Sequence, residues 1–416
     1  YKKENLPIVY TSLAFNTGTS NDPEDCGGTA SLLSRLIDEG AGPFNALELN
    51  DEIEMLGTNF SINAQQESFS FNFLSMSENF NKTFSLINYI INEPHLALDD
   101  FTREKKKLVD SLFQMKDNPS FLASRVFFLE VYKNTKFRRS SHGTAESLNN
   151  ISLDTVKHFY SENLKKSRAD LIVVGDADTE ILLRLAENLA LSPELPDIPA
   201  GSKIQYDDNP PVYIVHKKDS AQAEIRIGHI ANHRNTSDFF AKTIMNTILG
   251  GQFSSRINLN LRENKGYTYG ASSGFRYRKD IGSFIITTAV ETKNALAAVS
   301  EIFNEIQGIR ESISDEEIEF AKSFLVKRFP SMFETYSQIA SSINSILFYG
   351  LPDDYYKTYI PKVLETDKNQ VLKSACDNIF LGKMIITASG DKDKLSEQFE
   401  GKFNPIIIDP SDSPIF

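Results

Sequence analysis

The sequence predicts an α+β fold made of two duplicated α/β-layer domains, each a mixed sheet covered by helices. Gly175-Asp176 and Gly390-Asp391, each at the end of an apolar run, lie 215 residues apart. Helical segments that begin at Leu98 and at Ile313 repeat the same offset. Two independent matches at one period indicate duplication of a domain.

The first half opens and closes with predicted strands. Phe69, Phe71 and Phe73 alternate with polar residues, which is the period of a strand with one buried face. The elements expected in order are a strand at 8–15, a helix at 27–40, strands within 60–74, a helix at 104–114 and a strand at 171–174.

The second half repeats this order of elements. The elements expected are strands within 212–230, a helix at 258–264, a strand through Tyr267 and Tyr269, a helix at 317–329 and a strand at 385–388. Between the halves, three prolines and a glycine within 191–202 predict an extended linker. We expect an N-terminal domain at 1–195, a linker at 196–210 and a C-terminal domain at 211–416.

Composition excludes several classes of protein. Of the 416 residues 40% are hydrophobic, which is typical of a globular chain, and the formal net charge of −12 disfavours a nucleic-acid binder. No apolar run is long enough to span a membrane. Two cysteines, Cys26 and Cys376, are too few for a disulfide scaffold; we expect buried free thiols, with one long-range bridge as the alternative.

The segment 27–40 predicts a short amphipathic helix that Gly40 ends in a left-handed conformation. Opposite its apolar stripe lie Ser31, Ser34 and Arg35, at the spacing at which a helical zinc site places two histidines and a carboxylate. Arginine offers no lone pair and adds a positive charge, so this face cannot bind zinc. The capping candidates before the helix are Asn21, Asp22 and Asp25.

Two other patterns carry little chemistry. His229 and His233 are four residues apart, but 224–230 alternates as a strand, which separates the rings, so we expect surface histidines rather than metal ligands. The run 249–256 contains Gly250-Gly251 without the lysine of a phosphate-binding loop, and it predicts a tight loop that lets another backbone approach.

The segment 258–270 stands out in the second half. It predicts a helix that ends near Asn264, a cap at Gly266 and then a strand. On pattern alone, Arg262 is a solvated residue at the end of the helix and Tyr269 is a residue of the sheet.

The whole chain resembles the M16 metallopeptidases, the pitrilysin-type family with an inverted zinc motif, in their short two-repeat class. The resemblance implies a LuxS/M16 metalloenzyme-like fold. The segments that carry it are Gly18–Pro23, Leu36–Gly40, the two Gly-Asp closing strands, Leu249–Gly251 with Ser255-Arg256, and Leu261–Tyr269.

The resemblance implies that the zinc site of this chain is degenerate. Members with a working site carry His-x-x-Glu-His on the first helix, with a third glutamate ligand on a later helix. Ser31 and Arg35 stand at the two histidines, Ser34 at the catalytic glutamate and Ser111 at the third ligand, while Glu104 matches an auxiliary glutamate. All three metal ligands and the general base are therefore missing.

The resemblance also implies what is retained. Arg262 and Tyr269, seven residues apart, match a pair that binds the peptide backbone and stabilises the oxyanion, and Gly250 and Gly251 would let substrate approach. The chain would then act in a heterodimer whose partner supplies zinc and the general base, with no metal bound by this chain.

Two alternatives stay open. The first is a catalytically inactive binding or scaffold protein, acting alone or as a homodimer. The second concerns location. The chain starts at Tyr1 as if a leader had been removed, and this start together with the similar bacterial proteins suggests the periplasm, with the cytoplasm as the alternative.

Overall fold

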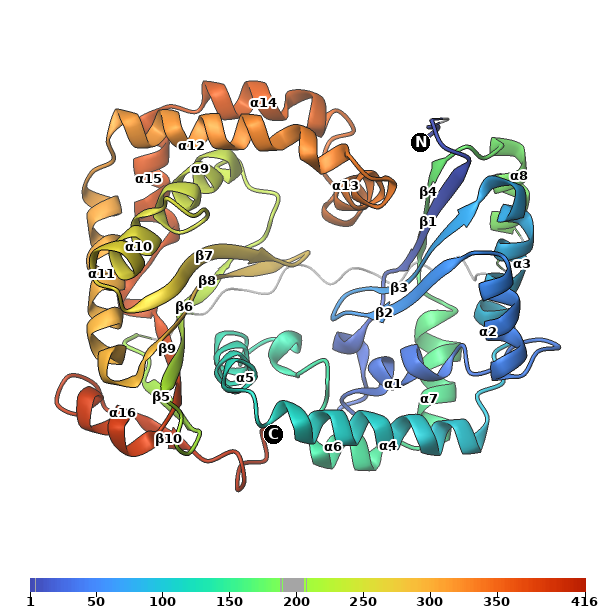
Figure 1. The fold of residues 1–416 in the computed structure, drawn as a ribbon, viewed down its shortest axis with the longest axis horizontal. Helices are drawn as coiled ribbons and strands as arrows, with labels where there is room; N and C mark the ends of the chain where they lie inside the picture. The colour runs from blue at the N-terminus through green and yellow to red at the C-terminus, as the bar shows by residue number, and fades with distance from the viewer. Residues whose placement is uncertain (4, 188, 190–205, 207) are drawn as a thin grey trace. The chain divides into compact units, whose positions relative to one another are not determined.

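The structure is a computed structural model that describes residues 1–3, 5–187, 189, 206 and 208–416 (Figure 1). Most of the expected linker, 196–205 and 207, lies outside the described residues. The chain divides into two compact units. Unit 1 comprises Tyr1–Phe113, Arg139–Pro199 and Ser331–Leu347, and unit 2 comprises Gln114–Arg138, Ala200–Pro330 and Phe348–Phe416.

Unit 1 is built on an antiparallel four-stranded sheet in the order β2-β3-β1-β4. Its strands are β1 (Ile8–Phe15), β2 (Asn59–Ala64), β3 (Phe69–Met76) and β4 (Ala169–Gly175). Its helices are α1 (Thr29–Leu36), α2 (Ala46–Met55), α3 (Phe80–Asn92), most of α4 (Leu98–Met115), α6 (Ala145–Asn150), α7 (Leu153–His158), α8 (Thr179–Glu187) and most of α13 (Tyr336–Tyr349).

Both faces of this sheet are covered. Phe69, Phe71 and Phe73 are buried on one face of β3, as their alternation predicts. The other face carries Ile172 and Val174 of β4, which form a cluster with apolar side chains of α13. In β4, Ile172 and Val174 are buried by α13, while Leu171 and Val173 on the opposite face are half-buried.

Unit 2 is built on a six-stranded mixed sheet in the order β10-β5-β9-β6-β8-β7, in which β5 runs parallel to β9 and β10. Its strands are β5 (Val212–His216), β6 (Gln222–Asn232), β7 (Thr268–Tyr277), β8 (Ile281–Glu291), β9 (Ile385–Gly390) and β10 (Ile406–Ile408). Its helices are α5 (Pro119–Val131), α9 (Phe239–Leu249), α10 (Arg256–Asn258), α11 (Ala295–Glu311), α12 (Asp315–Arg328), α14 (Tyr355–Glu365), α15 (Lys368–Asn378) and α16 (Lys392–Phe399).

The two units share one strand order. The order β2-β3-β1-β4 recurs as β7-β8-β6-β9, and β4 and β9 are the closing strands found 215 residues apart. This recurrence confirms the duplicated α/β layers.

Each half of the sequence gives one helix to the other unit. Helix α5 belongs to unit 2, where Leu122, Val126 and Phe127 are fully buried in one cluster with residues of β5, β6, β8 and β9. Its counterpart about 215 residues later is α13, most of which belongs to unit 1. Neither unit is therefore built from one continuous half of the chain.

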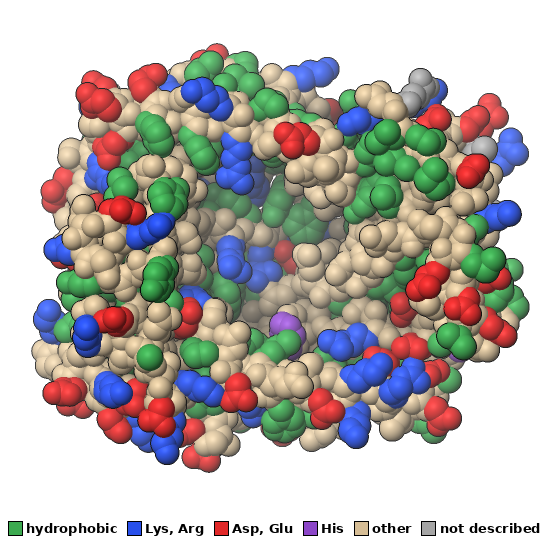
Figure 2. Space-filling model, viewed as in Figure 1, with side chains coloured by type: hydrophobic (Ala, Val, Ile, Leu, Met, Phe, Trp, Pro, Cys, Tyr) green, Lys and Arg blue, Asp and Glu red, His purple; other side chains and the backbone are tan. Residues whose placement is uncertain are grey.

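The surface and the thiols agree with a mixed-charge globular chain. Side chains of both signs are scattered over the face shown in Figure 2, without one dominant basic patch. Cys26 and Cys376 are free thiols and both are half-buried, so the expectation of full burial was too strong. Among the described residues, none of the helices has the length and apolar composition needed to cross a bilayer.

Candidate active-site pocket in the second unit

Arg262 lies on a π-helical segment, Leu259–Asn264, which continues α10. The inner side of this segment is anchored by Ile257 and Leu261, which are fully buried. Gly266, at φ +65°, reverses the chain as the sequence predicts, and β7 begins two residues later. Because the apolar side is fixed inward, the side chain of Arg262 points outward and stays 37% exposed.

Tyr269 is presented by a β-bulge at the start of β7. The pairing with β8 shifts between Thr268 and Ala271, so two residues on β7 face one on β8. A bulge leaves its extra residue out of the ladder and turns it away from the sheet. Tyr269 is accordingly 90% exposed.

Arg262 and Tyr269 line one open pocket of about 600 Å³. The pocket lies between β7, β8, β6, the loop after α9 and the first turn of α5. Gly250 and Gly251 line it as well, so the four second-half residues singled out by sequence belong to one site. The other lining residues are Ser120, Glu224, Arg226, Gln252, Phe253, Asn258, Gly270, Ala271, Ser272, Ser273, Thr287, Thr288 and Ala289.

The guanidinium of Arg262 keeps donors available for a ligand. Its Cζ lies 4.6 Å from the ring centroid of Phe253, and its Nε lies 3.5 Å from Glu263 Oε1. Within the described part of the chain, its two terminal nitrogens donate no hydrogen bond. A planar, charged guanidinium with unused N–H groups binds well to the oxygen of a ligand.

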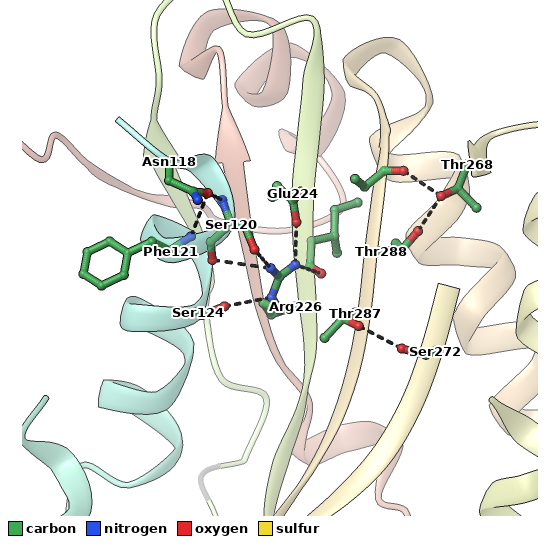
Figure 3. Close-up of polar contacts among 12 residues, drawn as sticks. Asn118, Ser120, Phe121, Ser124, Glu224, Arg226, Thr268, Ser272, Thr287 and Thr288 are labelled. Carbon is green, nitrogen blue, oxygen red and sulfur yellow. Dashed lines mark hydrogen bonds and ion pairs between the residues drawn. The ribbon is translucent and has the colours of Figure 1, made fainter. Parts of the chain in front are cut away.

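Arg226, the second arginine of the pocket, is saturated by its own surroundings (Figure 3). It is 5% exposed. Its Nη1 donates to Glu224 Oε2 at 2.8 Å and to the carbonyl of Ile225 at 2.9 Å, while its Nε donates to Ser124 Oγ at 3.0 Å. Its Nη2 donates to the hydroxyl and the carbonyl of Ser120 at 2.6 and 3.4 Å. These bonds use all five guanidinium N–H groups and hold α5 against β6.

Hydroxyl groups cover the strand side of the pocket. Thr287 and Ser272 share a hydrogen bond of 3.0 Å across β7 and β8, and Thr288 donates to Thr268 at 3.1 Å (Figure 3). The strand side is therefore polar but largely self-paired. The more available donors of the pocket are the terminal nitrogens of Arg262 and the phenol of Tyr269.

The structure explains the glycine pair by the chain's own packing. A Cβ on Gly250 would lie 2.5 Å from Ser273 Oγ, and one on Gly251 would lie 2.9 Å from the side-chain nitrogen of Asn246. The predicted close approach of another backbone is thus confirmed, and it is made by β7, since Ser273 N donates to the carbonyl of Gly250 at 2.9 Å.

In unit 1, the positions of the degenerate zinc motif have no metal chemistry of their own. Ser31 Oγ donates to the carbonyl of Ser141 at 2.6 Å, Ser34 Oγ to that of Ser31 at 2.9 Å and Ser111 Oγ to that of Leu108 at 2.8 Å. Three hydroxyls bonded to the backbone and the guanidinium of Arg35 do not fit a zinc ion. Among the described residues, no group of three His, Cys, Asp or Glu side chains is placed to hold a metal.

Two buried carboxyl groups, those of Asp22 and Glu104, hold the surroundings of α1 in place. The carboxylate of Asp22 accepts the backbone N–H groups of Gly28 at 2.7 Å and Ala30 at 2.9 Å, as expected of a capping residue. Glu104 is buried, and its Oε1 lies 2.6 Å from Lys107 Nζ and 3.2 Å from Arg103 Nε. The positive charges of Lys107 and Arg103 therefore balance the negative charge of Glu104.

His229 corrects an expectation. It lies in β6, as the alternation predicts, but it is 1% exposed rather than on the surface. Its Nδ1 donates to the carbonyl of Ile230 at 2.7 Å and its Nε2 accepts from Phe380 N at 3.2 Å. Burial lowers the pKa of His229 to about 4, with the bond to Ile230 opposing that shift, so the ring is a neutral core residue.

Three of the pocket residues that sequence reasoning missed matter most for its geometry: Arg226, Phe253 and Asn258. A charged pair, Glu224 and Arg226, within an otherwise buried strand was the available signal for the first. Phe253 and Asn258 had none, because their roles depend on contacts between a loop and a distant strand.

The fold is that of a duplicated two-sheet α/β protein, with a polar pocket in its second unit. Residues 1–145 match the family model of the insulinase family, peptidase family M16, and residues 150–325 match that of the peptidase M16 inactive domain. These matches together span most of the chain, and the chain belongs to peptidase family M16.

Relatives differ in the activity that their names imply. The chain is 22% identical to a non-peptidase homolog, YmxG, of Helicobacter pylori, over 88% of this chain and 85% of the relative. It is 26% identical to an uncharacterized zinc protease of Rickettsia bellii, over 77% and 78%. The crystal structure of a peptidase M16 inactive domain from Pseudomonas fluorescens shares the fold, with a TM-score of 0.83, 23% identity and coverage of 94% and 95%.

Proposed function

We propose that this chain is the non-zinc subunit of a two-chain M16 peptidase, in which Arg262 and Tyr269 act on the peptide bound at a partner's zinc site. One observation carries the proposal. Two arginines line the same pocket, and Arg226 has every donor engaged whereas the terminal nitrogens of Arg262 are bonded to no described residue. The first holds the fold together and the second is available to a ligand.

The chemistry suits acyl transfer. A zinc ion in the partner would supply an activated water and a Lewis acid. The carbonyl oxygen of a peptide becomes negative when it is attacked, and a guanidinium and a phenol are donors that bind that oxygen better as its charge grows. Removing one such donor costs about 3 kcal/mol of transition-state stabilisation.

A scaffold function is the second candidate. It is favoured by the similarity to a relative named as a non-peptidase homolog. In that case the same pocket binds a peptide or a partner segment without cleaving it, and no zinc-bearing chain is required.

The experiment that separates the two is native mass measurement after mild purification from the source, with zinc analysis of each species. The peptidase proposal predicts a complex of this chain with a second M16 chain that carries the zinc motif, one zinc per complex, and peptide cleavage by the complex but by neither chain alone. A homodimer free of zinc, with no zinc-bearing M16 chain recovered, would contradict it and support the scaffold.

A further inference from the structure

Asn258 connects the two parts of the pocket wall that carry Arg262 and Tyr269. Its Nδ2 donates to the carbonyl of Phe253 at 2.7 Å, and its Oδ1 accepts the backbone N–H of Ala271 at 2.9 Å. The residue is 4% exposed, so both bonds are shielded from water. A buried amide with a bond on each side has one orientation and holds both partners in place.

The first bond acts on the side of Arg262. Phe253 lies in the loop between α9 and α10, and its ring is 62% exposed although it is apolar. That ring supports the guanidinium of Arg262 at 4.6 Å from Cζ. A cation over an aromatic face is held by the ring quadrupole, so the position of the ring sets the position of the cation. Asn258 fixes the backbone from which that ring projects.

The second bond acts on the side of Tyr269. Ala271 is the residue at which the pairing with β8 resumes after the bulge. Its N–H is bonded to Asn258 instead of being left without a partner inside the fold. The bond therefore ties the C-terminal end of the bulge to α10, two residues from Tyr269.

We propose that Asn258 is a positioning residue that sets Arg262 and Tyr269 at a fixed separation, so that both reach one bound peptide carbonyl. The inference rests on the proposed function for its catalytic consequence. Its structural part concerns this chain alone. The two parts can therefore be tested separately.

The test compares Asn258→Leu, which removes both bonds at similar volume, with Asn260→Leu. Asn260 lies on the same segment, outside the pocket, and donates to Glu301 and Glu305 at 3.1 and 2.6 Å. Both variants lose two hydrogen bonds, and only Asn258→Leu loses bonds to the pocket wall. In the chain alone, labelled with 15N-tyrosine, the backbone order parameter of Tyr269 is measured by NMR. In the peptidase complex, kcat and KM are measured.

Asn258→Leu is expected to lower the order parameter of Tyr269 and to lower kcat by about 10²-fold with a smaller change in KM, since small misplacements are costly in catalysis. Asn260→Leu is expected to change neither. Adding Tyr269→Phe to Asn258→Leu is expected to cost little more, because the two act together. An unchanged order parameter for Tyr269 in Asn258→Leu would overturn the inference whether or not a peptidase complex exists, and full additivity with Tyr269→Phe would overturn its catalytic part.

Discussion

The backbone of Ser273 in β7 donates a hydrogen bond of 2.9 Å to the carbonyl of Gly250, directly after α9. A Cβ on Gly250 would lie 2.6 Å from Ser273 N, closer than real Cβ contacts come. Gly250→Ala should therefore push β7 away and lower the free energy of unfolding by about 2 kcal/mol. Thermal unfolding measures the loss.

The matched control is Gly274→Ala. Gly274 is the residue after Ser273 in β7. A Cβ at Gly274 meets no atom within 4 Å. The change should be within about 0.5 kcal/mol of neutral. Equal destabilisation by the two alanines would show that the approach of β7 to Gly250 is not what requires a glycine there.

Arg226 should matter for stability rather than for binding. Arg226→Met leaves the carboxylate of Glu224, which is 24% exposed, and the hydroxyls of Ser120 and Ser124 without their partner. Leaving such acceptors unpaired costs about 1–3 kcal/mol. Arg184→Met serves as the control, because Arg184 is 75% exposed in a weak pair with Glu180. An exposed pair contributes about 0.5 kcal/mol or less. Equal thermal unfolding of the two variants would contradict the structural role of Arg226.

His229 should make stability depend on pH. The unfolded chain binds a proton near pH 6.5, whereas burial lowers the pKa of the folded state to about 4. The unfolded state therefore binds more protons between these values, and about 3 kcal/mol of stability present above pH 6.5 is lost as the pH falls to about 4. Urea unfolding across this range measures the slope.

His229→Gln should flatten that part of the profile, while His158→Gln, at an exposed position on α7, should leave it as it is. A profile with the same slope in His229→Gln and in the natural chain would show that another group causes the dependence.

The exchanged helices predict that the two halves of the chain depend on each other. A fragment of residues 200–416 lacks α5, whose Leu122, Val126 and Phe127 are fully buried in unit 2. It should unfold without a sharp transition, and adding a peptide of residues 114–138 or co-expressing residues 1–199 should restore one. Calorimetry measures this. A sharp transition in the isolated fragment would contradict the exchange.

Much of the fold could be predicted from local pattern. The alternation of Phe69, Phe71 and Phe73 gave β3 and its buried face, and the glycine at 266 gave the chain reversal before β7. These features depend on residues that are neighbours in the sequence, so they could be predicted from it. The 215-residue offset correctly indicated a repeated sheet.

The features that could not be predicted from the sequence depend on contacts between distant residues. The exchange of α5 and α13 follows from their packing against distant strands, which nothing in the local sequence of either helix indicates. Arg226 donates a hydrogen bond to Ser124, which lies 102 residues away in the sequence. The buried ring of His229 accepts one from the backbone of Phe380, which lies 151 residues away. In the pocket, Arg262 and Tyr269 were found by resemblance, whereas Asn258 needed the structure.

The most direct test of the central claim is the kcat of the peptidase complex reconstituted from this chain and a zinc-bearing M16 partner. Arg262→Ala and Tyr269→Phe should each lower kcat by about 10²–10³-fold, because each removes one donor to the oxyanion. Thermal stability should hardly change, since both side chains are substantially exposed. Arg184→Ala, in unit 1, should leave kcat unchanged. A complex that cleaves peptide equally well with Arg262→Ala and Tyr269→Phe combined would contradict the account.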